Sequence, residues 1–401
     1  MSAVYLNHAG VICALGADAG EVERNLFSAA PPLLPVSDRY SPGRPMPLGE
    51  VRATLPAAVL SSERMANASM TGEDSRNNRL LAAAMAPLLP VIEDLKARHG
   101  RDRIGIVIGT STSGIAEGEA ALSAAGEGLV LATDYHYGTQ EFSAPGRFLA
   151  RWLDLGGPCC VLSSACTSGG KALVSAARLL QLGVCDAVVA GGVDTLCRMT
   201  LAGFSALMVT ADTPCNPFSI NRRGINIGEG AALFVMTREA GPVRLAGWGE
   251  SSDAHHISSP DPQGRGAEAA IRQALARAGL APGQIDYINL HGTATAQNDQ
   301  VEALAVNRVL GAAVPCSSTK PLTGHTLAAA GAVEALLCWL LLQRSDGRLP
   351  PHRWDGQPDP AMAPLAGLGR DRLGRPARTA MSNSFAFGGN NLSLILTREA
   401  P

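Results

Sequence analysis

The chain has 401 residues, of which 46% are apolar and 17% are charged, so it is long and apolar enough to bury a large core. Its formal net charge of −2 gives no overall basicity, and this argues against a nucleic-acid partner. Nine cysteines occur without a C-x-x-C pair, and their odd number argues against a disulfide framework.

The N-terminus carries no basic segment followed by an apolar core, so we expect no secretory signal. The most apolar stretch, Leu327 to Leu342, contains Glu334 and is short for a bilayer span. We therefore expect a cytoplasmic protein with no membrane association.

Short apolar runs alternate with helical patterns along the chain, in the order expected of an α/β protein. The runs that predict strands are Ile104–Ile108, Cys159–Leu162, Ala187–Ala190, Ala232–Met236, Tyr287–Leu290 and Leu392–Leu396. The segments that predict helices are Leu80–Leu95, Thr167–Leu182, Ala267–Ala278, Gln300–Leu310 and Thr326–Leu342. Pro87 and Pro90 should kink or split the first helix. Strands that are apolar throughout are typical of a sheet covered on both faces.

The two halves of the sequence share a weak echo, which indicates a duplicated architecture. In the first half, Cys159–Leu162 leads into Ser-Ser-Ala-Cys-Thr-Ser-Gly-Gly and an Ala/Leu-rich helix. In the second, the segment 314–318 leads to Gly-His-Thr at 324–326 and another Ala/Leu-rich helix. Gly241-Pro242 marks a seam between the halves.

Cys166 lies between a predicted strand and a predicted helix. The positive end of the helix macrodipole favours a thiolate there, and the glycines at 169 and 170 allow close approach of a substrate. This placement fits a covalent nucleophile, although a buried cysteine is as readily a packing residue.

Two histidines follow in strand-end and helix-start positions, His291 in His-Gly-Thr-Ala-Thr and His325 in Thr-Gly-His. Each alone is more commonly a structural residue. Together with Cys166 they predict one site at one edge of a sheet.

Several motifs together resemble those of the β-ketoacyl-[acyl-carrier-protein] synthases, the thiolase-fold condensing enzymes of fatty acid and polyketide synthesis. The motifs are Ala-Cys-Thr-Ser-Gly at 165–169, Ala-Gly-Gly at 190–192, Gly-Glu-Gly at 228–230, His-Gly-Thr at 291–293, Lys320 with Gly-His at 324–325, and Asn-Ser-Phe-Ala-Phe-Gly-Gly-Asn-Asn at 383–391. The resemblance runs from about Val11 to Leu396. It implies a thiolase-like α/β fold with a duplicated five-layer αβαβα architecture, divided into an N-terminal half, 1–240, and a C-terminal half, 241–401.

The resemblance also implies a role for each catalytic residue. Cys166 would carry the acyl group, and His291 and His325 would stabilise the malonyl thioester oxygen as its enolate forms. A Lys320–Glu334 pair would orient the second histidine, His325.

Further residues would bind and admit the substrate. The backbone N–H groups of Cys166 and Phe387 would form a second oxyanion hole, and Phe387 would act as a gating aromatic next to Phe385 and Gly388. Thr293, Thr295 and Ser258 would contact the pantetheine arm.

The implied activity is an acyltransferase reaction, the decarboxylative Claisen condensation of an acyl group with malonyl-acyl-carrier protein to give a 3-oxoacyl-carrier in fatty acid biosynthesis. The alternative is a specialised polyene (aryl-polyene-like) or type II polyketide pathway, with a chain-length-factor-like subunit. The implied partners are the acyl carrier protein and a second subunit, in a homodimer or a heterodimer. No metal and no resident cofactor are expected, because the substrates travel on the carrier's phosphopantetheine.

Other classes fit less well, and some departures from the family pattern remain. A thiolase would need a second cysteine near the C-terminus, and a chain-length factor typically lacks the nucleophile. No ligand set has zinc-site spacing, and no G-x-S-x-G elbow of a hydrolase occurs.

Ala386 and Asn390 replace the family's usual glycine and threonine, and the carrier docking patch is not evident.

Overall fold

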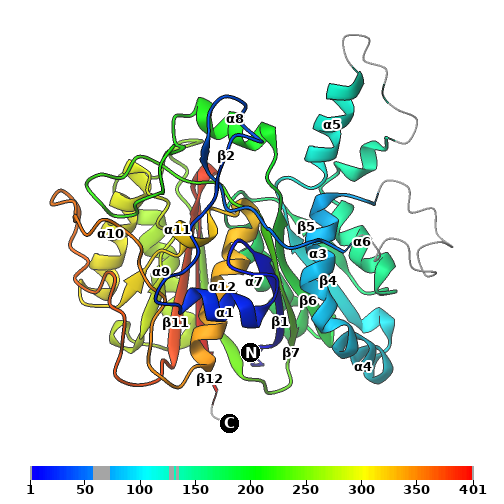
Figure 1. Cartoon of the computed structure of the whole chain (residues 1–401). Coiled ribbons are helices and arrows are strands. Elements are labelled where there is room, and N and C mark those ends of the chain that lie inside the picture. Colours follow the sequence, from blue (N-terminus) through cyan, green and yellow to red (C-terminus); the bar gives the residue numbers. More distant parts are fainter. Residues whose placement is uncertain (1, 57–72, 126–130, 132–134, 400–401) are drawn as a thin grey trace.

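The computed structural model describes residues 2–56, 73–125, 131 and 135–399 (Figure 1). The strands are β1 (Tyr5–Cys13), β2 (Val36–Ser37), β3 (Met46–Pro47), β4 (Ile104–Gly109), β5 (Cys159–Leu162), β6 (Ala187–Asp194), β7 (Gly230–Thr237), β8 (Val243–Ser252), β9 (Tyr287–Asn289), β10 (Cys316–Ser317), β11 (Thr379–Ala386) and β12 (Asn390–Arg398).

The α-helices are α1 (Ala19–Leu26), α3 (Arg76–Met85), α4 (Leu89–His99), α5 (Ile115–Ala125), α6 (Ala144–Trp152), α7 (Ser168–Gln181), α8 (Arg198–Ala206), α9 (Arg265–Ala278), α10 (Ala296–Leu310), α11 (Lys320–Thr323) and α12 (Ala330–Gln343). The short 3₁₀ helices are η2 (Ala86–Leu88), η3 (Arg101–Arg103), η5 (Tyr137–Thr139), η6 (Pro282–Gln284), η7 (Leu327–Ala329) and η8 (Phe387–Gly389).

The strand order repeats between the two halves of the chain. The first half pairs its strands in the order β5-β4-β6-β7-β1, and the second pairs them in the order β10-β9-β11-β12-β8. In both halves the first three strands of this order are parallel to one another, and each of the last two runs antiparallel to the strand before it. The halves join where β1 meets β8, at the pair Tyr5 and Arg244. The repeat confirms the duplicated thiolase-like fold.

The helices and sheets form five layers (Figure 1). Helices α7 and α12 pack against each other between the two half-sheets, α9 and α10 cover the outer face of the second, and α3, α4 and α6 cover that of the first. One hydrophobic cluster fills the central layer, and two more lie under the outer helices. Helix α12 is buried on almost every side, which explains its unbroken run of apolar residues.

The predicted helix Leu80–Leu95 is divided into α3, η2 and α4. Pro87 lies in the first turn of η2 and Pro90 in the first turn of α4. Proline is tolerated only where its missing N–H has no helical acceptor, so the split expected from the sequence is confirmed.

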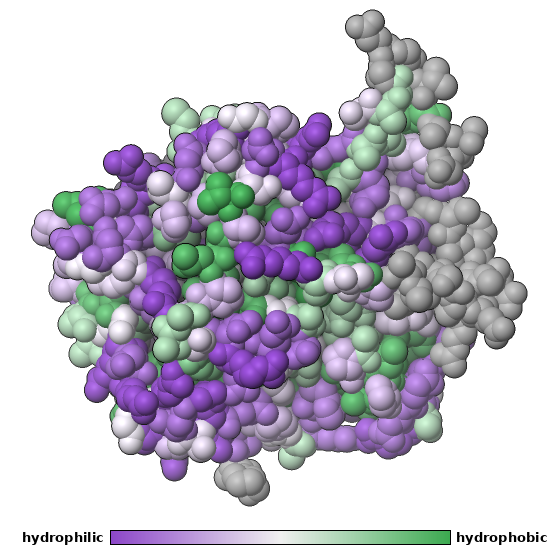
Figure 2. All heavy atoms as spheres, in the orientation of Figure 1, coloured by the Kyte–Doolittle hydropathy of each residue, from purple (hydrophilic) through white to green (hydrophobic). Residues whose placement is uncertain are grey.

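The face shown in Figure 2 is mostly hydrophilic, with hydrophobic residues in small, separate groups. In the described part of the chain, none of the helices combines the length and the apolar composition that a membrane crossing requires.

Candidate active site

The nucleophile turn lies between β5 and α7. Ala165 adopts a left-handed φ of 51°, and Cys166 and Thr167 follow directly before the first residue of α7. Ser168 fixes the turn, because its hydroxyl donates to the Ala165 carbonyl and accepts from the Ser164 amide at 2.8 Å. A Cβ on Gly169 would lie 2.9 Å from the Ala328 carbonyl oxygen, so glycine is needed for α7 to reach the start of the α12 region. Cys166 is thus held just before the N-terminus of α7.

His325 belongs to the corresponding turn of the second half, before η7 and α12. Its backbone N–H donates to the Asn226 carbonyl at 2.7 Å, and its carbonyl accepts from Gly228 at 2.9 Å. These contacts place His325 Nε2 2.9 Å from Cys166 Sγ. The two turns that share a sequence pattern in the two halves therefore meet and form one site.

Burial controls the protonation of this pair. It raises the pKa of the Cys166 thiol to about 12, although the Lys320 charge opposes the shift. Burial also holds the pKa of His325 well below its usual range. The expectation that the helix start favours a thiolate is wrong for the resting protein, because desolvation outweighs the helix dipole. Burial therefore disfavours both the thiolate of Cys166 and the imidazolium of His325 in the resting protein.

His291 faces His325 across the site. The ring centroids lie 5.4 Å apart, with an interplanar angle of 85°. The backbone amides of His291 and Gly292 donate to the Glu302 carboxylate at 2.8 and 2.7 Å. Burial and the nearby Lys320 charge lower the pKa of His291 well below its usual range. A neutral His291 can present one N–H to a substrate.

Lys320 supports His291 rather than His325. Its ammonium lies 3.5 Å from His291 Nδ1, donates to the His291 carbonyl, and pairs with Glu334. Both members of this ion pair are buried. The expectation that the Lys320–Glu334 pair orients the second histidine is therefore wrong. The cause is the fold, since β9 and β10 pair directly and place the His291 turn beside α11. A lysine at Nδ1 leaves Nε2–H of His291 as the donor that faces the cavity.

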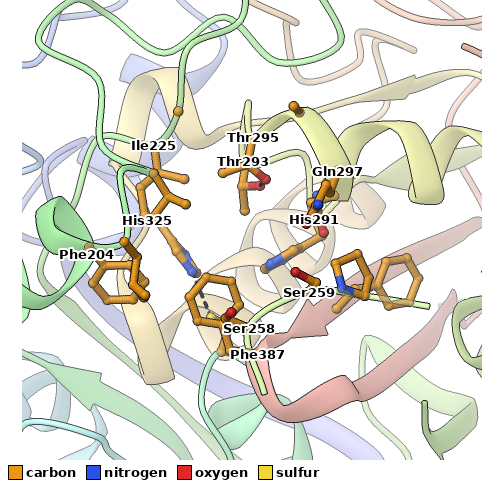
Figure 3. A pocket seen from close by; sticks show the side chains of 18 of the residues that line it. Phe204, Ile225, Ser258, Ser259, His291, Thr293, Thr295, Gln297, His325 and Phe387 are labelled. Atoms are coloured by element: carbon orange, nitrogen blue, oxygen red, sulfur yellow. Dashed lines mark hydrogen bonds between the residues drawn. The ribbon is translucent and has the colours of Figure 1, made fainter. Parts of the chain in front are cut away.

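A cavity of about 490 Å³ opens onto Cys166, His291 and His325. In Figure 3 the rings of His291 and His325 point toward each other across it, with Phe387 and Ser258 beside them and Thr293 and Thr295 on the wall. Of the residues predicted from the sequence, those that line it are Cys166, His291, His325, Thr293, Thr295, Ser258, Phe385 and Phe387.

Lys320 and Glu334 lie behind His291, outside the lining. Gly388, at a φ of 76°, is in the turn after Phe387, and its amide donates to the Ile257 carbonyl at 2.7 Å. The Phe387 ring packs against that of Phe204, a residue of α8, with the ring centroids 5.8 Å apart.

Sequence reasoning missed two buried carboxylates on α10. Glu302 holds the His291 turn, and Asp299 accepts from the amides of Ala294 and Phe218 at 3.1 and 2.8 Å. Burial raises the pKa of Asp299 to about 6 and that of Glu302 to about 7. Two acidic residues one helical turn apart, directly after the histidine motif, are the signal that could have revealed them.

The ligand atoms of Cys166, His291 and His325 all lie within 4.8 Å of one another, so the trio has the spacing of a partial metal site. The Lys320 ammonium beside His291 opposes a second cation there. The Cys166–His325 contact instead fits a nucleophile with a proton partner.

Two family models match the chain. The β-ketoacyl synthase N-terminal domain matches residues 75–241, and the β-ketoacyl synthase C-terminal domain matches residues 243–353. The chain belongs to the β-ketoacyl synthase family.

Individual members of the β-ketoacyl synthase family cover the chain to different extents. The 3-oxoacyl-[acyl-carrier-protein] synthase 2 of Rhizobium meliloti (strain 1021) is 38% identical over 61% of this chain, and the match spans 62% of that relative's length. The mitochondrial 3-oxoacyl-[acyl-carrier-protein] synthase of Arabidopsis thaliana is matched over 56% of its length. Nodulation protein E of Rhizobium sp. (strain N33) is 31% identical over 98% of both chains.

A solved complex of a ketosynthase with its chain length factor, from Xenorhabdus doucetiae, contains a similar chain. It is 45% identical, has a TM-score of 0.92, and the match covers 99% of this chain and 98% of that one. A β-ketoacyl synthase of Burkholderia phymatum STM815 is 27% identical over both full lengths, with a TM-score of 0.83.

Proposed function

We propose that the protein catalyses the decarboxylative Claisen condensation of an acyl group, held as a thioester on Cys166, with malonyl-acyl-carrier protein. The product is a 3-oxoacyl-carrier. The observation that carries this proposal is the 2.9 Å contact between Cys166 Sγ and His325 Nε2, with His291 facing the same cavity.

In the first step the Cys166 sulfur attacks the acyl thioester of the carrier. The new S–C bond forms, the S–C bond to the carrier breaks, and the Cys166 thiol proton passes to the leaving carrier sulfur. The tetrahedral oxyanion lies near the backbone N–H groups of Cys166 and Phe387, which would stabilise it. Gly388, with its positive φ, allows the turn that holds Phe387 at the cavity.

In the second step malonyl-carrier enters and loses carbon dioxide. The electron pair of the broken C–C bond moves into an enolate, whose oxygen receives hydrogen bonds from His291 and His325. Acylation of Cys166 removes the thiol contact of His325 Nε2 and so frees that nitrogen for the substrate. The enolate carbon then attacks the Cys166 thioester, and the cysteine sulfur leaves as a thiolate that takes a proton from solvent.

The pantetheine arm would pass Thr293, Thr295 and Ser258, with Phe385 and Phe387 against the reacting carbons. The two threonine hydroxyls lie 3.0 Å apart and line the cavity, so they can donate to the amides of the arm. The proposed reaction needs no resident cofactor, because the carrier's phosphopantetheine brings both acyl groups.

The second subunit would join at β5. This edge strand exposes Cys159 and Cys160, and the exposed side chains of Tyr137 and Phe142 precede the helix that packs beside it. An exposed edge strand is a template for pairing with another chain. The partner would be a copy of this chain or a related subunit, in a cytoplasmic enzyme.

The 45% identity to a chain of a ketosynthase–chain length factor complex, over nearly the full length, favours the second candidate, a specialised polyene or polyketide synthase. The relatives named 3-oxoacyl-[acyl-carrier-protein] synthase match at 38% over about three fifths of the chain. Size-exclusion light scattering of the purified chain separates the assemblies. A dimer supports self-pairing, whereas a monomer that dimerises only with a co-expressed related subunit supports the second candidate.

The test of the condensation itself is a product assay. The protein is incubated with an acyl-carrier and malonyl-carrier, and the carrier is analysed by intact mass. We expect one 3-oxoacyl-carrier and one molecule of carbon dioxide per catalytic turnover. If the chain, alone and with a co-expressed subunit, produces no 3-oxoacyl-carrier over a panel of acyl lengths, the proposal is wrong.

A further inference from the structure

A fully buried carboxylate, Asp194, joins the two halves of the molecule outside the cavity. It is the last residue of β6 and has no exposed surface. Five hydrogen bonds reach it from the segment after β4, donated by the Thr110 hydroxyl and by the amides and hydroxyls of Ser111 and Thr112. A sixth, at 2.7 Å, comes from the Ala328 amide in the second half.

The two oxygens of Asp194 have different partners. Oδ1 accepts from Thr110, from both groups of Thr112 and from the Ser111 amide, whereas Oδ2 accepts from the Ser111 hydroxyl at 2.5 Å and from the Ala328 amide. A carboxylate is an acceptor at every site, so an ionised aspartate satisfies all six donors. Burial raises the pKa of Asp194, and the converging donors oppose that shift.

The Ala328 amide lies three residues after His325, in a strained turn. Leu327, between them, has a left-handed φ of 52° and is 3% exposed. Such a conformation is unfavourable for a residue with a side chain and persists only where its surroundings enforce it. The Asp194–Ala328 hydrogen bond is one of the contacts that enforce it.

The backbones of the two halves also touch beside the Asp194–Ala328 hydrogen bond. A Cβ on Gly192, two residues before Asp194, would lie 3.1 Å from the Ala328 carbonyl oxygen and 3.1 Å from the Gly169 Cα. Gly169 is in the first turn of α7, three residues after Cys166. A shift of Ala328 by a few tenths of an ångström therefore moves the His325 turn relative to the nucleophile turn.

We propose that Asp194 is a positioning residue, which sets the distance between His325 Nε2 and Cys166 Sγ by holding the Ala328 amide against the first half. The inference rests on the proposed condensation, because it assigns to Asp194 the alignment of the two residues that react there. Asp194 itself does not line the cavity and would not touch the substrate.

Asp194→Asn is the direct test. Its amide will retain the four donors of Oδ1 and put the NH₂ group at Oδ2, where it cannot accept from Ala328. We expect kcat for condensation to fall at least tenfold while KM for both carriers stays within twofold. Ser111→Ala is the matched control, because it removes the other donor to Oδ2 and keeps the Ala328 contact. Its kcat should stay within threefold of the unsubstituted protein.

Gly192→Ala provides an independent variant if Asp194→Asn does not fold. The added methyl group presses on Ala328 without changing the carboxylate, so kcat should fall by about threefold to tenfold at unchanged KM. Gly283→Ala is its control, since a Cβ there meets nothing within 4 Å. Each variant is assayed at a temperature where circular dichroism shows it folded.

Unchanged kcat in a folded Asp194→Asn or Gly192→Ala protein would overturn the inference, and so would equal losses in Asp194→Asn and Ser111→Ala. Failure of the unsubstituted protein to acylate Cys166 or to condense would instead overturn the proposed function, so the two failures are distinguishable.

Discussion

The β5–α7 turn and the β10–α12 turn occupy equivalent places in the two halves, yet they supply different chemistry. The first is short and presents a sulfur, with strained Ala165 directly before Cys166. The second is longer, contains α11 and η7, and presents an imidazole before strained Leu327. The inserted α11 also brings Lys320 beside His291. Duplication thus provided two facing helix starts, and the extra residues in the second half provided the proton-handling and charged groups.

The edges of the two half-sheets differ as well. Strand β10 is buried, and the segment around Leu368 bridges to it, whereas Cys159 and Cys160 of β5 are exposed. Among the residues that the structure describes, the edge of the second half is covered by its own chain, and that of the first half is open. This difference is why we place the second subunit at β5.

Replacing the imidazole of the second turn should have the largest effect. His325→Ala removes a donor to the forming enolate, so malonyl decarboxylation should fall by about a hundredfold to a thousandfold, while acylation of Cys166 remains measurable. Carbon dioxide release and intact mass measure the two steps separately. Equal loss of both steps would contradict the different roles of the two turns.

Breaking the Lys320–Glu334 pair should destabilise the second half. Lys320→Met leaves a buried carboxylate without its partner, at a cost of about 3–5 kcal/mol in the free energy of unfolding. The double variant Lys320→Met/Glu334→Leu should recover most of that stability but not the activity, because His291 still lacks the lysine. Urea unfolding and the condensation assay check the two parts. Full activity in the double variant would refute the role of Lys320 at His291.

The pH dependence of stability should reveal Glu302. Its pKa is raised from about 4.5 to about 7 by burial, so between these values the folded protein binds more protons than the unfolded chain. The free energy of unfolding should therefore fall as the pH rises through this window. Glu302→Gln should lose part of this slope, and Asp299, shifted in the same direction, accounts for a part that remains. An identical slope in Glu302→Gln would be contrary evidence.

Relieving the strain of the first turn should have the smallest effect. Ala165→Gly removes a left-handed non-glycine residue, which is worth about 1 kcal/mol, partly offset by the greater entropy of glycine in the unfolded chain. We expect a stabilisation of at most 1 kcal/mol by thermal unfolding. A marked loss of stability would mean that the φ of Ala165 carries no strain.

Much of this arrangement could be predicted from the sequence, because it follows from apolar periodicity and short motifs. The strands β4, β5, β6 and β7 and the helices α7, α9 and α12 are apolar enough to identify. The strand β11 was missed because Ser382, Asn383 and Ser384 interrupt its apolar pattern, yet all three are buried. The Asn383 side chain is hydrogen-bonded to Glu302 and Ser393, a pairing that no local pattern reveals.

The candidate site, too, could be predicted only in part, because some of its contacts are tertiary. Cys166, His291 and His325 carry recognisable motifs, but the neighbour of Lys320 and the roles of Asp194 and Glu302 depend on how the two halves meet. The protonation of Cys166 was mispredicted, because a helix start is visible in the sequence and the extent of burial is not.

The most direct test of the account is acylation of Cys166 itself. The protein, Cys166→Ala and the control Cys160→Ala are incubated with an acyl-carrier and analysed by intact mass. The account predicts one acyl group per chain in the unsubstituted protein and in Cys160→Ala, and none in Cys166→Ala. Persistent acylation of folded Cys166→Ala would contradict it.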